Sequence, residues 1–230
     1  MPTLVEKPLT TSRADADALL ALAEDRGVPV MVDHTYLFHP GFRAMKQEAL
    51  VLGELQALRT AGGNWGPFRR DVDVVWDWAP HDVAMCLDLV GDRPVEIEAW
   101  SKQRQTTPEG VGEVIEVRLT FEDGVAADLR VGNLMEHRTR FLAAIFGRHK
   151  LIFSDEGGDA LTHHVRPDRQ RSSADEEPAK AVPVADTPPL TVAVQEFAEA
   201  IRHRSTDLSG LRLAVDVVSV LEQCQAALGR

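Results

Sequence analysis

Cysteine is scarce in this chain of 230 residues, which contains only Cys86 and Cys224. Each thiol lies in an apolar helical pattern, which predicts buried, reduced cysteines and argues against a disulfide framework or a zinc site. No apolar run approaches the roughly 18 residues that a membrane span needs. The first residues also lack the basic and apolar segments of a signal peptide. We therefore expect a cytoplasmic protein with no membrane partner.

Basic residues are outnumbered, with 25 Lys and Arg against 36 Asp and Glu, and the formal net charge is −11. Such a chain repels a phosphate backbone, so we expect no nucleic-acid partner. The signatures of phosphate loops and hydrolytic nucleophiles are also missing. There is no Gly-x-Gly-x-x-Gly between a strand and a helix, no P-loop, no Gly-x-Ser-x-Gly and no Cys-His nucleophile arrangement.

The first residues follow a strand–helix–strand order. Apolar residues predict a strand at 3–6 and another at 28–32. Between them, Ser12 resembles the first residue of a capping box and Gly27 ends the helical pattern. This order is typical of a parallel unit from a larger doubly wound domain.

The rest of the chain is dominated by strands. A helix over 39–52 and a strand over 54–65, broken at Gly62-Gly63, come first. Five further strands then predict a sizeable, mainly antiparallel sheet, at residues 95–105, 113–121, 125–131, 138–146 and 150–153. Residues 167–189 are typical of a loop, and two helices end the chain, with Ser209 as the cap of the second.

The densest polar segment contains Asp77 and His81, four residues apart. Pro80 is expected at the first position of a helix, which would place His81 in the first turn, where partial positive charge disfavours imidazolium. A neighbouring carboxylate has the opposite effect and favours imidazolium, so one interpretation is that His81 is a general acid/base. The other is that Asp77 caps the helix and His81 is structural. Spacing alone favours the structural interpretation by roughly three to one.

Two predicted strand ends carry further candidates. Lys7 follows the first strand, where parallel sheets bind ligands, so it could hydrogen-bond a substrate hydroxyl. A solvated lysine at a turn is the alternative, and spacing alone favours it. His34 and Tyr36 follow the second strand and could line a pocket or simply pack.

Arginine and tryptophan side chains offer weaker signals. Arg69 and Arg70 could bind a phosphate or carboxylate, and an exposed loop pair is about equally favoured. Trp76 could stack on a sugar ring, although most tryptophans are packing anchors. Arg138 and Arg140 alternate along a predicted strand, and we interpret them as part of a solvated sheet face.

A metal site is not expected. His163 and His164 are adjacent in sequence, and adjacent residues of a strand point to opposite faces. No third ligand accompanies them.

Four segments match one set of motifs in order along the whole chain. Glu6-Lys7-Pro8 lies at a strand end, and residues 32–40 form a hydrophobic segment with Asp33 and His34 that leads into a helix. Residues 75–82 hold the Asp-x-x-x-His pair, and residues 189–228 form a closing helix pair. Together these resemble the Gfo/Idh/MocA family of oxidoreductases, in a form seen in members linked to nucleotide-sugar metabolism. The family usually has Gly where this chain has Asp33.

The resemblance implies a catalytic set of Lys7, Asp77 and His81. Lys7 would bind the reacting hydroxyl, His81 would take or give its proton, and Asp77 would orient or assist. The cofactor would be NAD or NADP. Its binding residues would be Glu6, Pro8 and His34, with a cis Lys7–Pro8 bond. The residues expected to bind substrate are Tyr36, Arg69, Arg70 and Trp76.

The resemblance also implies an α+β fold. A large, mainly antiparallel open sheet would carry helices packed on one face, beside a strand–helix–strand remnant of a Rossmann domain. Residues 1–36 would be that remnant, and residues 37–230 the substrate and oligomerisation domain, with a homo-oligomer formed through the open sheet face. The substrate would be a small sugar-like molecule.

Three functions remain open. The Gly-rich turn of the family's dinucleotide-binding domain is absent from the sequence, so the first is a truncated NAD(P)-dependent oxidoreductase of a sugar, polyol or nucleotide-sugar. The second is a cofactor-free acid–base enzyme on the same scaffold, such as an epimerase, lyase or cyclase. The third is a non-catalytic partner subunit. We weight them roughly 5:3:2 because the motifs are hypotheses.

Overall fold

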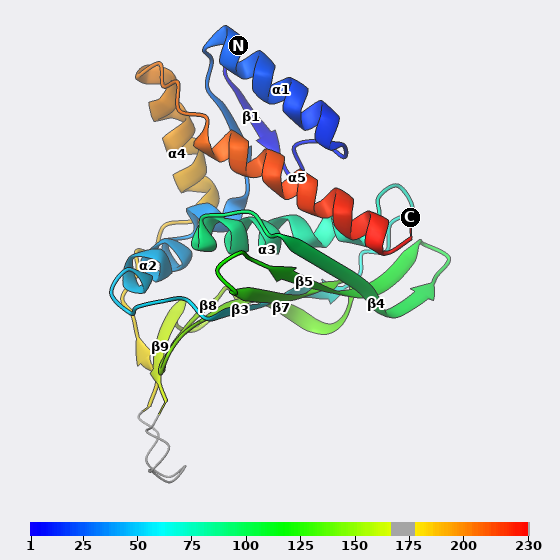
Figure 1. Cartoon of the computed structure of the whole chain (residues 1–230), viewed down its shortest axis with the longest axis vertical. Helices are drawn as coiled ribbons and strands as arrows, with labels where there is room; N and C mark the ends of the chain where they lie inside the picture. Colours follow the sequence, from blue (N-terminus) through cyan, green and yellow to red (C-terminus); the bar gives the residue numbers. More distant parts are fainter. Residues whose placement is uncertain (167–177, 230) are drawn as a thin grey trace.

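A computed structural model describes residues 1–166 and 178–229, which form a two-stranded sheet, an eight-stranded sheet and five α-helices (Figure 1). The described helices cover one face of the large sheet, and the small sheet lies beyond them. The predicted α+β class is therefore confirmed.

The small sheet pairs β1 (Thr3–Glu6) with β2 (Val30–Asp33) in parallel, through α1 (Arg13–Arg26). The Ser12 side chain accepts a hydrogen bond from the Asp15 backbone N–H at the start of α1, and Gly27 ends the helix with a φ of 55°. That left-handed conformation is easily reached by glycine, which has no Cβ. Both predicted ends of the helix are confirmed.

The large sheet has the strand order β10-β9-β8-β7-β3-β6-β5-β4. Every neighbouring pair is antiparallel except β3 and β6, which run in parallel. The strands are β3 (Ala57–Trp65), β4 (Glu96–Thr106), β5 (Val111–Thr120), β6 (Ala126–Gly132), β7 (Leu134–Phe146), β8 (His149–Ser154), β9 (Leu161–Val165) and β10 (Lys180–Ala181).

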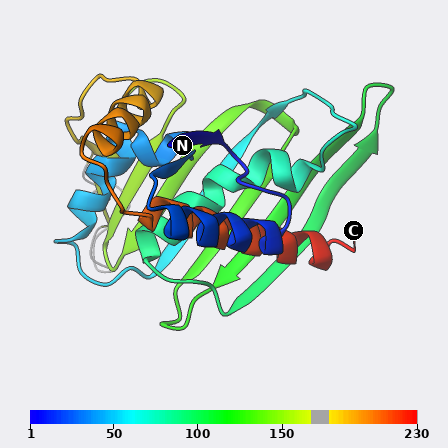
Figure 2. The same ribbon diagram turned by 90° about the horizontal axis from the view of Figure 1, so that it is seen from above.

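The helices stack in layers on this sheet. One short 3₁₀ helix, η1, spans Thr35–Phe38. The remaining α-helices are α2 (Pro40–Ala49), α3 (Val74–Val90), α4 (Pro189–Arg202) and α5 (Ser209–Ala227). Helix α3 packs on β3 and β6, and α5 contacts both α3 and β4. Helix α1 lies along α5, so the small sheet reaches the large one through α5 (Figure 2).

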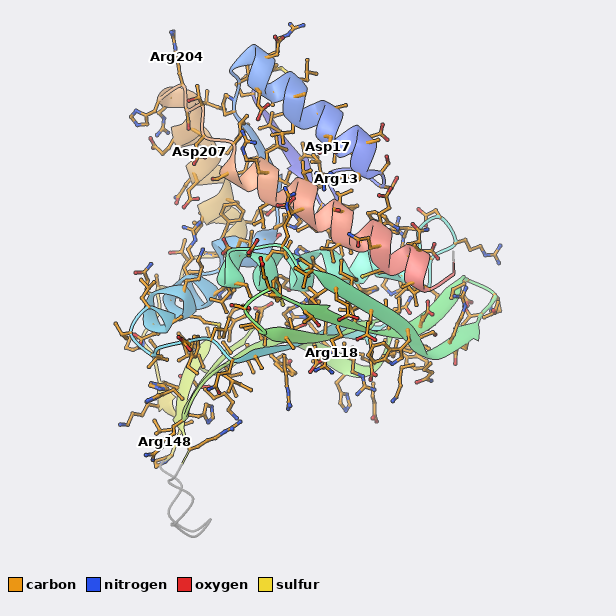
Figure 3. All side chains as sticks on the ribbon, in the orientation of Figure 1. Arg13, Asp17, Arg118, Arg148, Arg204 and Asp207 are labelled. Atoms are coloured by element: carbon orange, nitrogen blue, oxygen red, sulfur yellow. The ribbon has the colours of Figure 1, made fainter. Side chains whose placement is uncertain are left out.

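Alternation along β5 shows which sheet face is covered. Ile115, Val117 and Leu119 belong to the buried core, whereas Arg118 is exposed on the opposite face. Figure 3 places Arg118 on the side of the sheet that is turned away from the helices. This period of two is expected for a sheet with one packed face.

Two local predictions were wrong, and both concern residues that later matter for the site. Helix α3 begins at Val74, with Pro80 inside it rather than at its first position, so His81 is not in the first turn. Burial of Val74 and Val75 against the core extends the helix before the proline. Gly62-Gly63 do not break β3, because β6 and β7 pair with the strand on both sides through these residues.

The predicted N-terminal cap of the last helix, α5, was also wrong. Ser209 is the first residue of α5 rather than its cap, and the Asp207 side chain accepts a hydrogen bond from the Ser209 backbone N–H at 2.8 Å. Of the loop predicted at 167–189, residues 167–177 lie outside the described part of the chain. Both cysteines are buried free thiols, as predicted.

No helix in the described part of the chain has the length and apolar character that crossing a membrane requires.

Candidate active site

The ends of β1 and β2 meet the N-terminal half of α3. Lys7 follows β1 directly, and its Nζ donates a hydrogen bond to the backbone oxygen of Asp77 at 2.6 Å. The same Nζ lies 3.9 Å from Asp77 Oδ1. Asp77 and His81 are four residues apart on α3 and therefore share one helix face. The Lys7–Pro8 peptide is cis.

His81 is held as a neutral imidazole. Burial lowers its pKa well below the usual value, and the charges of Arg140 and Lys7 lower it further. Within the described residues, Nδ1 of His81 is buried without a hydrogen-bond partner. A neutral imidazole at physiological pH can accept a proton.

His34 lies beside His81 with its ring centroid 6.4 Å away. It is 2% exposed, and burial, followed by the Lys7 charge, lowers its pKa to about 4. Neither ring nitrogen has a partner in the described chain, and Oδ1 of the neighbouring Asp33 has none either. Buried polar atoms are usually hydrogen-bonded, so this edge is suited to a polar group from outside the described chain.

The Lys7 ammonium is partly withdrawn from water. Burial lowers its pKa, and the Asp77 carboxylate opposes that effect. A desolvated ammonium that keeps a nearby carboxylate can still bind an oxygen strongly, because screening by water is reduced.

Tyr36 lies in η1 and packs against His81. Its ring stands at 88° to the His81 ring with centroids 5.0 Å apart. Its hydroxyl donates to Asp155 Oδ2 at 3.3 Å, and the Arg140 guanidinium carbon lies 4.8 Å from the ring centroid. Tyr36 is therefore held at both its ring and its hydroxyl.

Arg140 is the main residue that sequence reasoning missed. It is 5% exposed and donates from Nη1 to Asp82 Oδ2, so the interpretation of Arg140 as part of a solvated face was wrong. Arg138 does remain half exposed, bound to Asp155. Alternation along the strand correctly put both arginines on one face, but it could not indicate that α3 would cover only one of them. The available signal was Gly62, which lies opposite Arg140 in β3.

The proposed substrate-binding residues separate into two groups. Tyr36 lines the site, and Arg69 lies at its rim, with Nη1 3.8 Å from Asp77 Oδ1. Arg70 instead donates to the backbone oxygen of Pro108. Trp76 is 3% exposed and donates from Nε1 to Gln225 Oε1 at 2.8 Å, packed against α5. Substrate contact for Arg70 and Trp76 stays a prediction: Arg70 lies before α3, and Trp76 in the first turn of α3 is bonded to α5.

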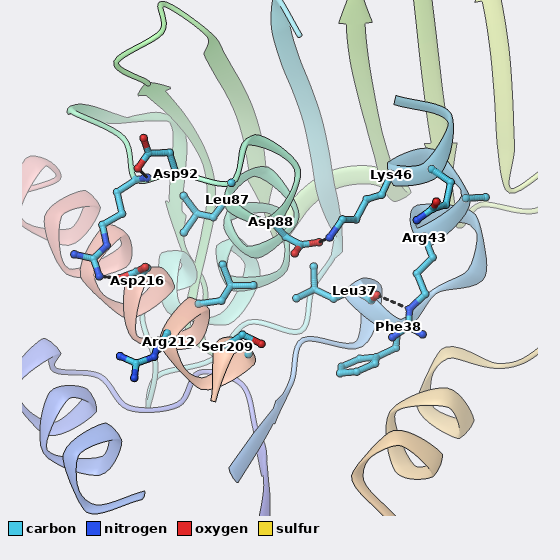
Figure 4. A pocket seen from close by; sticks show the side chains of 16 residues that line it. Leu37, Phe38, Arg43, Lys46, Leu87, Asp88, Asp92, Ser209, Arg212 and Asp216 are labelled. Atoms are coloured by element: carbon cyan, nitrogen blue, oxygen red, sulfur yellow. Dashed lines mark hydrogen bonds and ion pairs between the residues drawn. The ribbon is translucent and has the colours of Figure 1, made fainter. Parts of the chain in front are cut away.

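A separate pocket opens between η1, α2, α3 and α5 (Figure 4). Its cations are already paired: Arg43 with Glu196, Lys46 with Asp88, Arg93 with Asp216, and Arg212 with Glu24. None of Lys7, Asp77 and His81 lines it. We therefore place the candidate site at the β1–α3 junction and not in this pocket.

Metal ligands do not gather at the site or elsewhere in residues 1–166 and 178–229, where no group of three His, Cys, Asp or Glu side chains could hold an ion. His163 contacts His149 at 2.9 Å, and His164 contacts Thr162.

Comparison with known proteins matches the central part of the chain to a protein family. Residues 42–152 match the model of the GFO/IDH/MocA C-terminal domain. The chain is 37% identical to a candidate oxidoreductase from Magnetospirillum magnetotacticum MS-1, with a TM-score of 0.86, and the match covers 96% of this chain and 71% of that one.

Two curated relatives act on sugar nucleotides according to their names. UDP-N-acetylglucosamine 3-dehydrogenase from Acidithiobacillus ferrooxidans is 25% identical, over 99% of this chain and 72% of the relative. dTDP-3,4-didehydro-2,6-dideoxy-alpha-D-glucose 3-reductase from Streptomyces antibioticus is 28% identical, over 87% of this chain and 62% of the relative. More distant solved structures that share the fold include NAD- and NADP-binding oxidoreductases.

Proposed function

Because this chain belongs to the Gfo/Idh/MocA family of sugar and nucleotide-sugar dehydrogenases and reductases, we propose that it carries the proton-handling site of an NAD(P)-dependent member. The substrate would be a hydroxyl or ketone of a sugar, polyol or nucleotide-sugar. One observation carries the proposal: the Lys7 ammonium is anchored to Asp77 beside a neutral His81.

In the oxidative direction, the Lys7 ammonium hydrogen-bonds the substrate hydroxyl oxygen and favours loss of its proton. Neutral His81 accepts that proton at its imidazole ring, and Asp77 holds Lys7 in place. In the reductive direction, protonated His81 gives its proton to the developing alkoxide. Tyr36 and Arg69 border the substrate.

Glu6, Pro8 and His34 are the residues that would hold the nicotinamide end of the cofactor. The unpartnered nitrogens of His34 and Oδ1 of Asp33 suit a polar, amide-bearing ring at this edge. When bound, NAD(P) supplies the hydride acceptor or donor at the reacting carbon. Under this proposal, residues 1–36 belong to a cofactor domain and residues 37–230 to the substrate domain.

The test is an activity assay of the complete gene product with NAD⁺ or NADP⁺ and a panel of sugars, polyols and UDP- and dTDP-sugars. We expect nicotinamide reduction with at least one of these substrates. No reduction across the panel, together with solvent-hydrogen exchange at a sugar carbon, would instead favour cofactor-free acid–base chemistry.

We also propose that the open sheet face joins copies of this chain. Beside the exposed Arg118, this face carries a hollow with apolar residues that include Leu134, Met135 and Phe141. We expect analytical ultracentrifugation to show a dimer or larger assembly, and Phe141→Glu to shift it to monomer because a buried charge without a partner is costly. A monomeric wild-type protein would contradict this arrangement.

A further inference from the structure

Arg140 is tied to four parts of the fold. Its guanidinium pairs with Asp82 on α3 and covers the Tyr36 ring next to β2. Its backbone N–H donates to Glu156 Oε1 at 2.7 Å, and its backbone oxygen accepts from the Asp155 N–H at 3.0 Å. Gly62 on β3 lies directly opposite, and a Cβ there would fall 2.3 Å from Arg140 Nη1. A long, flexible side chain is thus confined to one position.

Two contacts connect Arg140 to His81. The first runs through Asp82, which follows His81 in the chain, so the ion pair restrains α3 next to the histidine. The second runs through Tyr36, whose ring is in contact with both Arg140 and the His81 ring. Arg140 itself is only 5% exposed, which leaves little of it to touch a substrate.

Titratable groups around His81 come from several elements. Lys7 follows β1, His34 follows β2, Tyr36 lies in η1, Arg140 projects from β7, and Asp77 and Asp82 lie on α3 with His81 itself. Arg140 and Lys7 both oppose a positive charge on the imidazole. Each of these cations has a carboxylate neighbour, Asp77 for Lys7 and Asp82 for Arg140, and Lys7 is closer to solvent than Arg140.

We propose that Arg140 is a positioning residue, which holds the His81 imidazole in its orientation against Tyr36 without contacting the substrate. This inference rests on the proposed function, because it assigns Arg140 a part in preparing the base of that reaction. The ion pair with Asp82 offsets the cost of burying the Arg140 guanidinium, so the guanidinium can remain against the Tyr36 ring.

The experiment is NMR spectroscopy of the His81 ring proton in the substrate-free protein, with the signal assigned by its loss in His81→Gln. Arg140→Met combined with Asp82→Asn removes both buried charges and leaves no unpaired one. We expect this double variant to change the ring-current shift that Tyr36 causes on the His81 proton, because the guanidinium that holds the Tyr36 ring is gone.

Arg140→Lys keeps the charge but cannot reproduce the planar guanidinium over Tyr36, so it should also change the ring-current shift that Tyr36 causes on the His81 proton. An unchanged ring-current shift in the folded double variant or in Arg140→Lys would overturn the proposal. Arg140→Lys decides the matter if the double variant does not fold. Neither measurement requires turnover, so a failure here is distinct from a failure of the proposed dehydrogenase activity.

Discussion

Replacing His81 by Gln is expected to lower kcat of the complete protein by about 10²–10⁴-fold, the usual contribution of a positioned acid or base. Glutamine preserves hydrogen bonding but cannot exchange a proton near neutral pH. KM for the sugar should change little, because Lys7 and the residues bordering the substrate remain. The measurement is steady-state kinetics with the substrate found in the activity assay.

His203→Gln is the matched control. The His203 side chain is 79% exposed at the end of α4 and contacts Glu199. Its replacement should leave kcat unchanged. If His81→Gln retains wild-type kcat while circular dichroism shows a folded protein, His81 is not the acid or base.

The pH dependence follows from the direction of the pKa shift. Because the pKa of His81 is lowered, the base form persists into acid and is lost only as pH falls through that lowered value. Activity in the oxidative direction should therefore have its acidic limb below the pKa of an ordinary histidine, which is about 6.5.

Replacing Gly62 by Ala should lower the free energy of unfolding by about 3 kcal/mol, between the costs of overpacking a core and of breaking a buried ion pair. An added Cβ would lie 2.3 Å from Arg140 Nη1 and 2.5 Å from Asp82 Oδ2. Both side chains are buried and paired, so neither can move aside without separating the two charges. Urea denaturation followed by tryptophan fluorescence measures the loss.

Gly210→Ala is the control for the backbone effect of the same substitution. Gly210 lies in α5, and a Cβ there meets no atom within 4 Å. Alanine at such a helical position should be neutral or stabilising by up to about 1 kcal/mol. A Gly62→Ala variant as stable as Gly210→Ala would show that β3 can shift away from the ion pair.

Local patterns in the sequence were sufficient for much of the fold. Ser12 and Gly27 mark the ends of α1 through backbone hydrogen bonding and a positive φ, which are properties of neighbouring residues. Alternating apolar residues likewise identified most strands of the large sheet. The helix start predicted at Pro80 was wrong. Proline normally interrupts a helix, but burial of the preceding Val74 and Val75 favours a helix that begins earlier and continues through Pro80.

Part of the candidate site was predictable, because a sequence motif places two of its residues on the same face of a helix. Asp77 and His81 are one helical turn apart, and Lys7 ends a strand, so their grouping needed only that the strand end should meet the helix. Proximity in sequence did not indicate that Arg70 would bond to Pro108 and Trp76 to Gln225, because it does not determine the direction of a side chain.

The sequence by itself determined the α+β class, the parallel strand–helix–strand unit and the one-turn spacing that puts Asp77 and His81 on one helix face. It did so because caps, periodicity and helical spacing act over a few neighbours. Only the tertiary structure decided that Arg140 is buried against Asp82 and Tyr36, since these three come from β7, α3 and η1. Their interaction depends on desolvation by packed layers, which no local pattern encodes.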